Sequence, residues 1–453
     1  MKLTSKPILS TLFLLSWPIM IGEGMQLMYN LADTFWVGQL GANELAAISL
    51  SFPLIFVMFS VGAGFSVAGT TLVSQHTGAG QTEKANRSAG QILLFSVLVS
   101  IFFSVVGLIF GKDLLRLMGA EPEVLAPAWE YFRIILFGAP LMFIYFIFSS
   151  VLQGVGDTKT PMKIKVGTVL INIVLDPFLI FGWWVFPQLG IAGAALATII
   201  SRLIAATIGL HILFTETKDI KLTLKDLKPD KKVIGKIIKI GSPAAIGVSA
   251  LSIALTVMTY IVTGFGTYAL AAWGVVSRIT SLIRLPSQGL SRSTNVLVGQ
   301  FLGDGKPEKA EESAWTGIKV VFSIMIILAF INLLFAPQII KPFTDTAQVA
   351  EIAVKYSRIA GFAFALLGVQ MVISGALKGA GKTFTQMFFR ILTLWVMQIP
   401  FTYLLAHNLG WGTDGIWWGV FFAKLFGCLI LLLWFKRGTW KQTVIETAPV
   451  LEK

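Results

Sequence analysis

Three acidic side chains stand in stretches of sequence that are otherwise apolar. Asp33 lies in "YNLADTFWVG", Asp176 lies in "NIVLDPFLIFG", and Glu23 lies between two glycines in "MIGEGMQLM". A carboxylate in such an environment inside a membrane costs at least about 2.5 kcal/mol, so it normally faces a cavity or a partner. These three residues are therefore the first candidates for chemistry.

The residues around Asp176 supply further oxygen atoms. Asn172 precedes Asp176 by four positions, which places both side chains on one face of a helix. Pro177 has no N–H, so the carbonyl four residues before it is left as an additional acceptor. With Asp33 and Thr198, these groups are hard oxygen ligands suited to Na⁺, and two close carboxylates can equally hold a proton. For Thr198 the simpler alternative is a hydrogen bond to its own helix backbone.

Two further charged residues are open between function and structure. Glu23 precedes Asp33 by ten positions, about 15 Å along a helix. There it contacts substrate, relays protons or hydrogen-bonds a neighbouring helix. Arg284 either contacts an anion or a lipid headgroup, or pairs with another group and fixes helices. Neighbours of Asp33 that suit an adaptable cavity complete the substrate or relay candidates: Met25, Gln26, Met28, Tyr29 and Phe35.

These residues must be positioned by membrane-spanning helices. Of the 453 residues, 55% are hydrophobic and 13% are charged, and apolar residues come in long runs such as 164–186. A helix needs roughly 20 such residues to cross a hydrocarbon layer of about 30 Å. We predict an all-α polytopic membrane protein with twelve spans, at 9–37, 44–74, 88–110, 127–152, 163–184, 190–214, 237–263, 268–299, 315–336, 348–377, 384–406 and 412–435.

The distribution of basic residues predicts the topology and argues against nucleic acid as a partner. The net charge is +13, but four connections contain no Lys or Arg, those near 38–43, 182–191, 263–269 and 407–415. Alternate connections are basic, and the longest of them carries Lys218 among its many lysines. This alternation is the positive-inside pattern of a protein of the inner or plasma membrane, so both termini are expected in the cytoplasm.

Few residues suit a disulfide, a metal centre of His and Cys, or a cleaved leader. Cys428 is the only cysteine and lies in an apolar run. The three histidines, His76, His211 and His407, lie in different connections or span ends. The first apolar segment has the length of a full span, so it is expected to be retained. No cofactor is expected beyond a coupling ion.

An internal repeat of about 225 residues divides the chain into halves. "VGQLGANELAA" (37–47) precedes "VTGFGTYALAA" (262–272) by 225 residues, and "GIAGAALATIISR" (190–202) precedes "GTDGIWWGVFFAK" (412–424) by 222. Six spans per half keep both halves in one orientation, with a pseudo-two-fold axis along the membrane normal. The predicted domains are an N-lobe at 1–214, a Lys-rich linker at 215–235, a C-lobe at 236–437 and a cytoplasmic tail at 438–453.

The two halves differ at the polar positions. Asp33 aligns with Met258, and Asp176 aligns with Ile399. Asn172 and Thr198 likewise align with apolar residues, Trp395 and Val420. A structural requirement of the fold is expected in both halves, so a cluster confined to the first half indicates function.

Two motifs resemble catalytic signatures without their context. "GVGD" (154–157) matches the GxGD of intramembrane aspartyl proteases, but Asp157 lies at a basic helix end and aligns with Lys382. "GALKGAGKT" (375–383) differs from a P-loop at Ala376, and no strand precedes it. Neither motif predicts an enzyme.

At "YNLADTFWVGQLG", "VSQHTGAG", "LQGVGDTKTP", "NIVLDPFLIFG" and "GIAGAALATIISR" the sequence resembles the multidrug and toxic compound extrusion (MATE) family over nearly its whole length. The resemblance implies six plus six helices in two lobes that export amphipathic, often cationic, compounds in exchange for H⁺ or Na⁺. Family members with a first-lobe cation site carry an aspartate matching Asp33 and an Asn-x-x-x-Asp matching Asn172 and Asp176. A threonine in the sixth helix of that site looks like Thr198.

A second branch of the family has acids in helices 7 and 10, where this chain offers only Ser249 and Gln370. The resemblance is therefore to the DinF-like branch, with coupling in the first lobe. Arg284 stands where the family pattern favours an apolar residue, which argues against a purely cationic substrate range.

We therefore predict a multidrug efflux antiporter and not an enzyme. Its coupling site comprises Asp33, Asn172, Asp176 and Thr198, which act as metal ligands if the ion is Na⁺. The expected partners are small amphipathic organic substrates and membrane lipids, and the chain is expected to act as a monomer. One alternative is a lipid or lipid-linked-precursor flippase. The other is an intramembrane aspartyl protease that uses Asp157.

Overall fold

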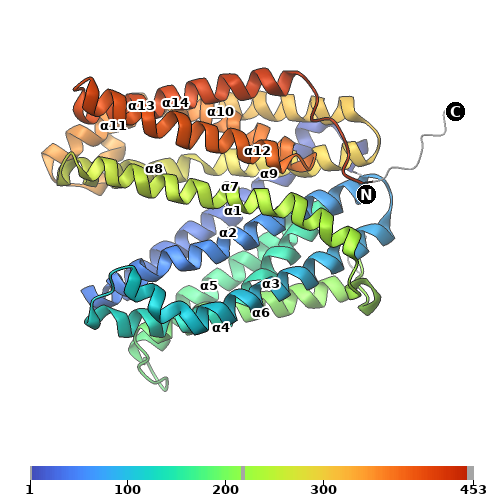
Figure 1. Ribbon diagram of the computed structural model, residues 1–453, viewed down its shortest axis with the longest axis horizontal. Coiled ribbons are helices and arrows are strands. Elements are labelled where there is room, and N and C mark those ends of the chain that lie inside the picture. The colour runs from blue at the N-terminus through green and yellow to red at the C-terminus, as the bar shows by residue number, and fades with distance from the viewer. Residues whose placement is uncertain (1–2, 216–219, 446–453) are drawn as a thin grey trace. The chain divides into compact units, whose positions relative to one another are not determined.

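The structure is a computed structural model that describes residues 3–215 and 220–445. Lys218 of the predicted linker and residues 446–453 of the predicted tail lie outside the described residues. The described chain is built of helices (Figure 1): α1 (Ile8–Gly38), α2 (Ala42–Gly78), α3 (Thr82–Leu117), α4 (Pro122–Gly154), α5 (Lys159–Phe181), α6 (Ile191–Phe214), α7 (Lys231–Thr263), α8 (Thr267–Ile283), α9 (Leu285–Gly303), α10 (Pro307–Ile340), α11 (Ala347–Gly379), α12 (Thr383–Ile391), α13 (Ile399–Tyr403) and α14 (Gly412–Lys436). Short 3-10 turns are η1 (Leu3–Ser5), η2 (Leu224–Leu227) and η3 (Lys341–Phe343), and two π-helical segments are η4 (Leu392–Gln398) and η5 (Leu404–Asn408).

Most helices of the described residues have the length and the apolar composition that are needed to cross a membrane. Eleven helices there are long and apolar enough to cross a bilayer. The one remaining expected span, 268–299, corresponds to α8 and α9 together. The predicted all-α membrane architecture is confirmed.

The expected span 268–299 is not one continuous helix. It is interrupted at Arg284, which ends α8 and begins α9. Pro286 explains the break, because it cannot donate to the carbonyl of Leu282 and its ring crowds that carbonyl. Arg284 therefore stands at a helix break rather than within a regular helix, a feature that hydropathy alone does not reveal.

The expected span 384–406 also departs from a regular helix. It begins as α12, widens into the π segment η4, returns to α13 and widens again into η5. Pro400 lies at the start of α13 and removes one backbone donor there. Segments of π-helix inside an α-helix occur often at functional sites.

The faces of α3 show how the helices meet lipid and protein. Apolar side chains at helical spacing are exposed on one face, among them Leu98, Phe102 and Ile109. The buried face carries small residues, and a Cβ added at Gly107 would lie 2.6 Å from Leu136 of α4. Small residues at such positions let two membrane helices approach closely, while the large apolar face suits hydrocarbon.

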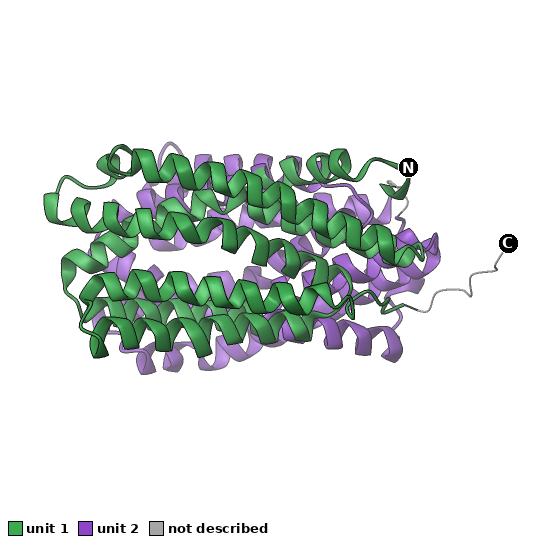
Figure 2. Cartoon of the chain, turned by 90° about the horizontal axis from the view of Figure 1, so that it is seen from above, with its two compact units in different colours: residues 1–20, 246–453 green, residues 21–245 purple. Residues whose placement is uncertain are grey.

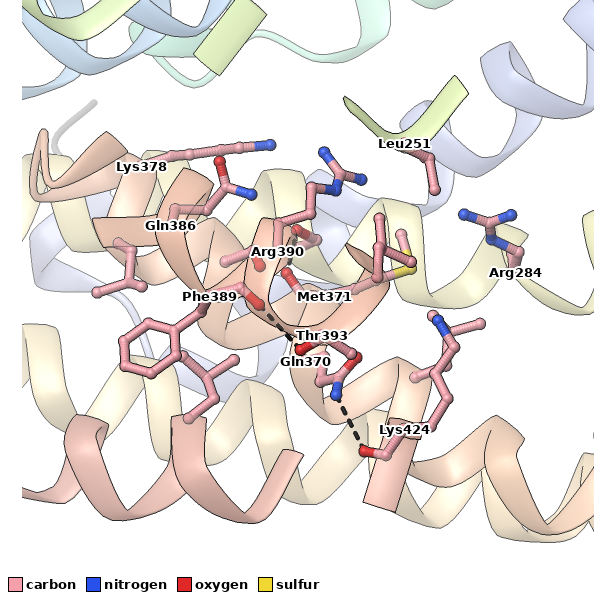
Figure 3. Close-up of a pocket in the computed structure, with 16 residues that line it drawn as sticks. Leu251, Arg284, Gln370, Met371, Lys378, Gln386, Phe389, Arg390, Thr393 and Lys424 are labelled. Carbon is pink, nitrogen blue, oxygen red and sulfur yellow. Dashed lines mark hydrogen bonds between the residues drawn. The ribbon is translucent and has the colours of Figure 1, made fainter. Parts of the chain in front are cut away.

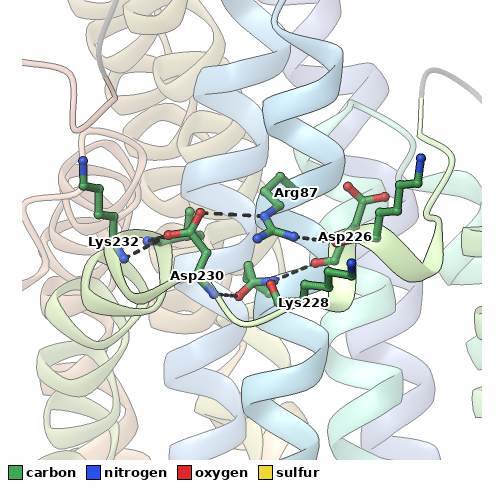
Figure 4. Close-up of polar contacts among 8 residues, drawn as sticks. Arg87, Asp226, Lys228, Asp230 and Lys232 are labelled. Carbon is green, nitrogen blue, oxygen red and sulfur yellow. Dashed lines mark hydrogen bonds and ion pairs between the residues drawn. The ribbon is translucent and has the colours of Figure 1, made fainter.

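The described part of the Lys-rich linker packs against α3 (Figure 4). The side-chain Nε2 of Gln91 donates to the carbonyl oxygens of Asp226 and Lys228, both at 2.7 Å. Its Oε1 accepts from the backbone N–H of Asp230 at 2.7 Å, and Arg87 pairs with Asp230 at 3.7 Å. This segment of the linker therefore has a defined structure.

Two compact units are defined by contacts within the chain (Figure 2). Unit 2 is Ile21–Ala245, and unit 1 comprises the chain up to Met20 and from Ile246 onward. Both α1 and α7 therefore change unit part-way. The two change points are separated by the same offset as the sequence repeat.

The compact units differ from the predicted lobes at the beginnings of α1 and α7. Leu12 and Leu15 of α1 are fully buried in a core that includes Leu290 and Phe364 of the second half. The start of α7 belongs to the first half in the same way, since a Cβ added at Gly241 would lie 2.3 Å from Phe65. Each half thus contributes the first part of its first helix to the other unit.

Candidate functional site

The four predicted coupling residues all belong to unit 2, on three helices. Asp33 is half-buried on α1, whereas Asn172 and Asp176 of α5 and Thr198 of α6 are at most 2% exposed. Nδ2 of Asn172 donates to Oδ1 of Asp176 at 3.4 Å. This contact shows that the two α5 side chains share a face, as their spacing predicts.

Three oxygen atoms of this cluster are buried without a hydrogen-bond partner among the described residues. They are Oδ1 of Asp33, Oδ1 of Asn172 and Oδ2 of Asp176. The Asp33 carboxylate also acts electrostatically on Asp176, so the two acids are close. Buried acceptors without donors are unfavourable, and a cation that binds all three would satisfy them.

Two tyrosines complete the surroundings of the acids. The hydroxyl of Tyr29 lies 2.8 Å from Oγ1 of Thr198, which joins α1 to α6. Thr198 thus has a partner other than its own helix backbone, and Tyr29, predicted as a substrate or relay candidate, lies within the coupling cluster. Tyr131 of α4 is 6% exposed and close enough for its phenol to interact electrostatically with Asp33. Sequence reasoning missed Tyr131, because nothing in the sequence of α4 marks the face that it occupies.

A positive charge also acts on the cluster. Arg202 of α6 interacts electrostatically with Asp33 and with Tyr29, although no Arg202–Asp33 ion pair within 4 Å is recorded among the described residues. Sequence reasoning missed Arg202 as well. The signal was present in the repeat, because the aligned segments 190–202 and 412–424 both end on a basic residue.

Close packing of α5 and α6 fixes the distance between Asp176 and Thr198. A Cβ added at Gly193 of α6 would lie 2.3 Å from the carbonyl oxygen of Leu179 on α5. The connection is pinned by hydrogen bonds from the N–H groups of Leu189 and Gly190 to the carbonyls of Leu179 and Ile180, both 3.0 Å. Glycine is therefore needed at this helix crossing.

Glu23 has an ionic partner. Its Oε1 lies 3.6 Å from Nζ of Lys165 on α5, and the two side chains are only 20% and 16% exposed. Of the alternatives open for Glu23, the structure contains a contact with a neighbouring helix, in the form of an ion pair. Two further candidates on α1, Met28 and Phe35, are 54% and 60% exposed.

The other predicted candidates have ordinary surroundings. Nε2 of Gln26 donates to Oδ1 of Asn30 at 3.4 Å, and Met25 is half-buried. Among the described residues, no three His, Cys, Asp or Glu side chains are grouped as metal ligands. A metal ion at the Asp33 cluster would therefore depend on amide and hydroxyl oxygens as well.

Asp157 has a local structural role at the start of α5. Its Oδ1 accepts from the N–H groups of Lys159 and Thr160, both at 3.1 Å, and its Oδ2 accepts from the Thr160 hydroxyl at 2.6 Å. A carboxylate in this position satisfies backbone donors that the first turn of a helix leaves open. These contacts account for Asp157 without catalysis.

Comparisons with known proteins agree on one family. The MatE family model matches residues 18–178 and 243–404, two regions whose starts are separated by the offset of the sequence repeat. The probable multidrug resistance protein YoeA of Bacillus subtilis (strain 168) is 29% identical over 434 residues, which cover 94% of this chain and 93% of YoeA. An FAD transporter of Shewanella oneidensis is 29% identical over 405 residues, 89% of this chain and 90% of the relative.

A solved structure shows the same fold. It is described as the outward-facing conformation of a multidrug resistance MATE family transporter of the MOP superfamily. It matches with a TM-score of 0.91 and 28% sequence identity, over 96% of this chain and 97% of the other.

Proposed function

Because the chain belongs to the MatE family of membrane transporters, we propose that it is a secondary active efflux antiporter. It exports amphipathic organic compounds, of the multidrug class named for YoeA, in exchange for H⁺ or Na⁺. Transport proceeds by alternating access, and the coupling site lies in the first half, as in the DinF-like branch.

The coupling residues are Asp33, Asn172, Asp176 and Thr198. The observation that supports this assignment is the set of three buried oxygens without donors in this cluster. A cation or proton that enters from outside satisfies those oxygens. When it leaves, Arg202 remains as a positive charge that acts on the Asp33 carboxylate.

The conformational step is a change in α1. Pro18 lies inside this helix, and α1 passes from one compact unit to the other directly after Met20. Pro243 of α7 stands in the equivalent place, two residues before that helix changes unit. A proline weakens the backbone ladder at such a point, so each helix has a hinge where it passes between units.

Efflux from proteoliposomes tests the proposal. Wild-type protein should export ethidium, an amphipathic cation, or flavin mononucleotide, an amphipathic anion, when either a Na⁺ or a pH gradient is imposed. One pH unit supplies about 1.4 kcal/mol per proton, enough for roughly tenfold accumulation. Asp33→Asn should abolish the response to the gradient, since it removes the charge that takes up the ion.

Thr34→Val is the matched control, because the Thr34 hydroxyl donates to the Asn30 carbonyl of its own helix. It should transport at the wild-type rate. Gradient-driven export that persists in Asp33→Asn would contradict the coupling assignment. The gradient that drives export identifies the ion.

The two alternatives have different outcomes. Membership of a transporter family makes the protease hypothesis wrong, and the capping contacts of Asp157 account for that residue. A lipid or lipid-linked-precursor flippase remains the second candidate, favoured by the position of Arg284 in a basic pocket. It predicts headgroup translocation that ionophores do not affect.

A further inference from the structure

Unit 1 contains a pocket with a strongly basic lining (Figure 3). Four basic side chains line it, namely Arg284 at the α8–α9 break, Lys378 of α11, Arg390 of α12 and Lys424 of α14. Its empty space, including the open mouth, is about 740 Å³. None of the described residues that line it is acidic.

Three of these positive charges have no acidic partner among the described residues. No ion pair of Arg284, Arg390 or Lys424 is recorded among the described residues, and Nε of Arg284 is buried without a partner. Instead, Arg284 interacts repulsively with Arg390 and Lys424, and Arg390 with Lys424. The four side chains are half-buried, and like charges grouped in a partly desolvated pocket repel one another unless an anion joins them.

The sequence repeat shows which charges have been removed. Lys165 of unit 2 and Arg390 of unit 1 occupy equivalent positions of the repeat, and the structure places them alike. An ideal Cβ on Gly22 would lie 3.6 Å from Cδ of Lys165, and one on Gly247 would lie 3.8 Å from Cδ of Arg390. Glu23, directly after Gly22, pairs with Lys165, but the residue after Gly247 is Val248.

A second pair of equivalent positions shows the same difference, a basic residue with an acid nearby in unit 2 and without one in unit 1. Arg202 and Lys424 end the aligned segments of α6 and α14. In unit 2 the charge of Arg202 acts on Asp33, whereas the counterpart of Asp33 is the fully buried Met258. Unit 1 therefore has both basic residues, Arg390 and Lys424, but apolar residues at the positions that correspond to the two acids.

Unit 1 also contains two basic residues whose counterparts in unit 2 are uncharged. Arg284 and Lys378 correspond, at the offset of the repeat, to the uncharged Phe59 and Gln153. A basic residue that only stabilised helix packing would be expected to keep an acidic partner such as Glu23. In unit 1, two basic residues lack the acids that accompany their counterparts in unit 2, and two further basic residues stand beside them. This excess of positive charge indicates a ligand that supplies the negative charge.

The walls of the pocket define the rest of that ligand. Apolar side chains also line it, including Leu251, Met371 and Phe389, as is usual in sites that bind small organic molecules. A guanidinium group matches phosphate oxygens in a bidentate geometry, and several bases together suit an anion with more than one charge. We propose that this pocket binds an amphipathic organic phosphate, an anionic phosphate ester attached to an aromatic or aliphatic body, as a transported substrate.

The statement that the ligand is transported rests on the proposed efflux function, but binding of the ligand can be measured without transport. Riboflavin, flavin mononucleotide and flavin adenine dinucleotide share one aromatic ring system and differ in phosphate. Quenching of flavin fluorescence by the purified full-length protein, in neutral lipid nanodiscs, measures the three affinities. Both phosphate esters should bind at least tenfold more tightly than riboflavin, and equal affinities would overturn the proposal.

Charge variants locate the site. Arg390→Gln and Lys424→Gln should each weaken binding of flavin mononucleotide about tenfold and leave riboflavin unchanged. Lys309→Gln is the control, because it removes one positive charge of unit 1 from an exposed ion pair with Glu312. Its affinity should remain within twofold of wild type. Thermal melting of each variant without ligand confirms folding, and the two pocket variants should melt no lower than wild type because they relieve repulsion.

Val248→Glu provides an independent test. It restores beside Arg390 the acid that Glu23 supplies beside Lys165, so it should weaken flavin mononucleotide binding without removing any base. If Val248→Glu, Arg390→Gln and Lys424→Gln all bind flavin mononucleotide with wild-type affinity, this pocket is excluded as the binding site. Such a result leaves the coupling proposal intact, because that proposal depends on Asp33.

The source of the phosphate is decided by competition. Phosphatidylglycerol in the nanodisc should displace flavin mononucleotide if the natural ligand is a lipid, and the displacement should require Arg390. A soluble organic phosphate is indicated if the lipid does not compete and flavin mononucleotide is exported from proteoliposomes. If Asp33→Asn binds flavin mononucleotide normally but no longer exports it, both proposals hold.

Discussion

At the scale of single residues, the acids of α1 have different tasks. Glu23 is compensated by Lys165 at 3.6 Å, whereas Asp33 carries a buried oxygen with no donor among the described residues. The first arrangement stabilises the contact of α1 with α5. The second leaves binding capacity for an ion. This difference separates two carboxylates that look equivalent in an apolar sequence.

The Glu23–Lys165 pair gives a prediction on stability. Glu23→Gln should lower the free energy of unfolding by about 1–3 kcal/mol, because it leaves Lys165 charged in a largely buried place. Adding Lys165→Met should recover part of that loss, since it removes the charge that Glu23 balances in the wild type. Thermal unfolding of the single and double variants in detergent measures the coupling, and strictly additive losses would disprove the pair.

At the scale of helices, breaks and close crossings decide where functional groups stand. Pro286 interrupts the expected span so that Arg284 lies between α8 and α9. Close contact at Gly193 holds α6 against the end of α5. The π segments η4 and η5 have no counterpart in α5, which is a regular α-helix. The break at Arg284 and the π segments therefore distinguish the second half from the first.

The α5–α6 crossing can be tested with two glycines. Gly193→Ala should destabilise the protein by about 1–3 kcal/mol, because overpacking forces the backbones apart. It should also reduce gradient-driven export, since Asp176 and Thr198 would separate. Gly167→Ala on α5 is the control, because a Cβ there meets nothing within 4 Å. Equal melting temperatures for the two variants would show that the crossing tolerates a methyl group.

At the scale of the whole molecule, the repeat and the two compact units have the same period. The family model matches twice, and α1 and α7 change unit, each time at the offset of the repeat. The halves share a scaffold but differ in charge. An acidic cluster lies in unit 2 and a basic pocket in unit 1, so we propose that one unit handles the coupling cation and the other an anionic substrate.

The linker between the halves has its own testable contact. Gln91→Leu removes three hydrogen bonds to the segment 226–230, each of which contributes about 0.5–1.5 kcal/mol. The linker should then be cut several times faster by a lysine-specific protease in limited proteolysis. Gln348→Leu, at an exposed position of α11, should not change the cleavage rate. Identical cleavage in both variants would refute the docking of the linker on α3.

Much of the architecture follows from order along the chain. Apolar runs of spanning length, alternating basic connections and a fixed offset are serial properties, so the sequence predicts the spans and the repeat. The oxygen cluster was also predictable in part. Asn172 and Asp176 are four residues apart on one helix, and the comparison of the halves marks Asp33 as exclusive to the first.

Only the tertiary structure showed which helix faces meet. In a membrane helix both the lipid side and the protein side are apolar, so periodicity does not mark the buried face. The sequence therefore did not predict three features: the pairing of Glu23 with Lys165, the approach of Arg202 to Asp33 and the grouping of four basic residues. Arg284 and Lys424 stand far apart in the sequence, and packing of the helices of unit 1 makes them line one pocket.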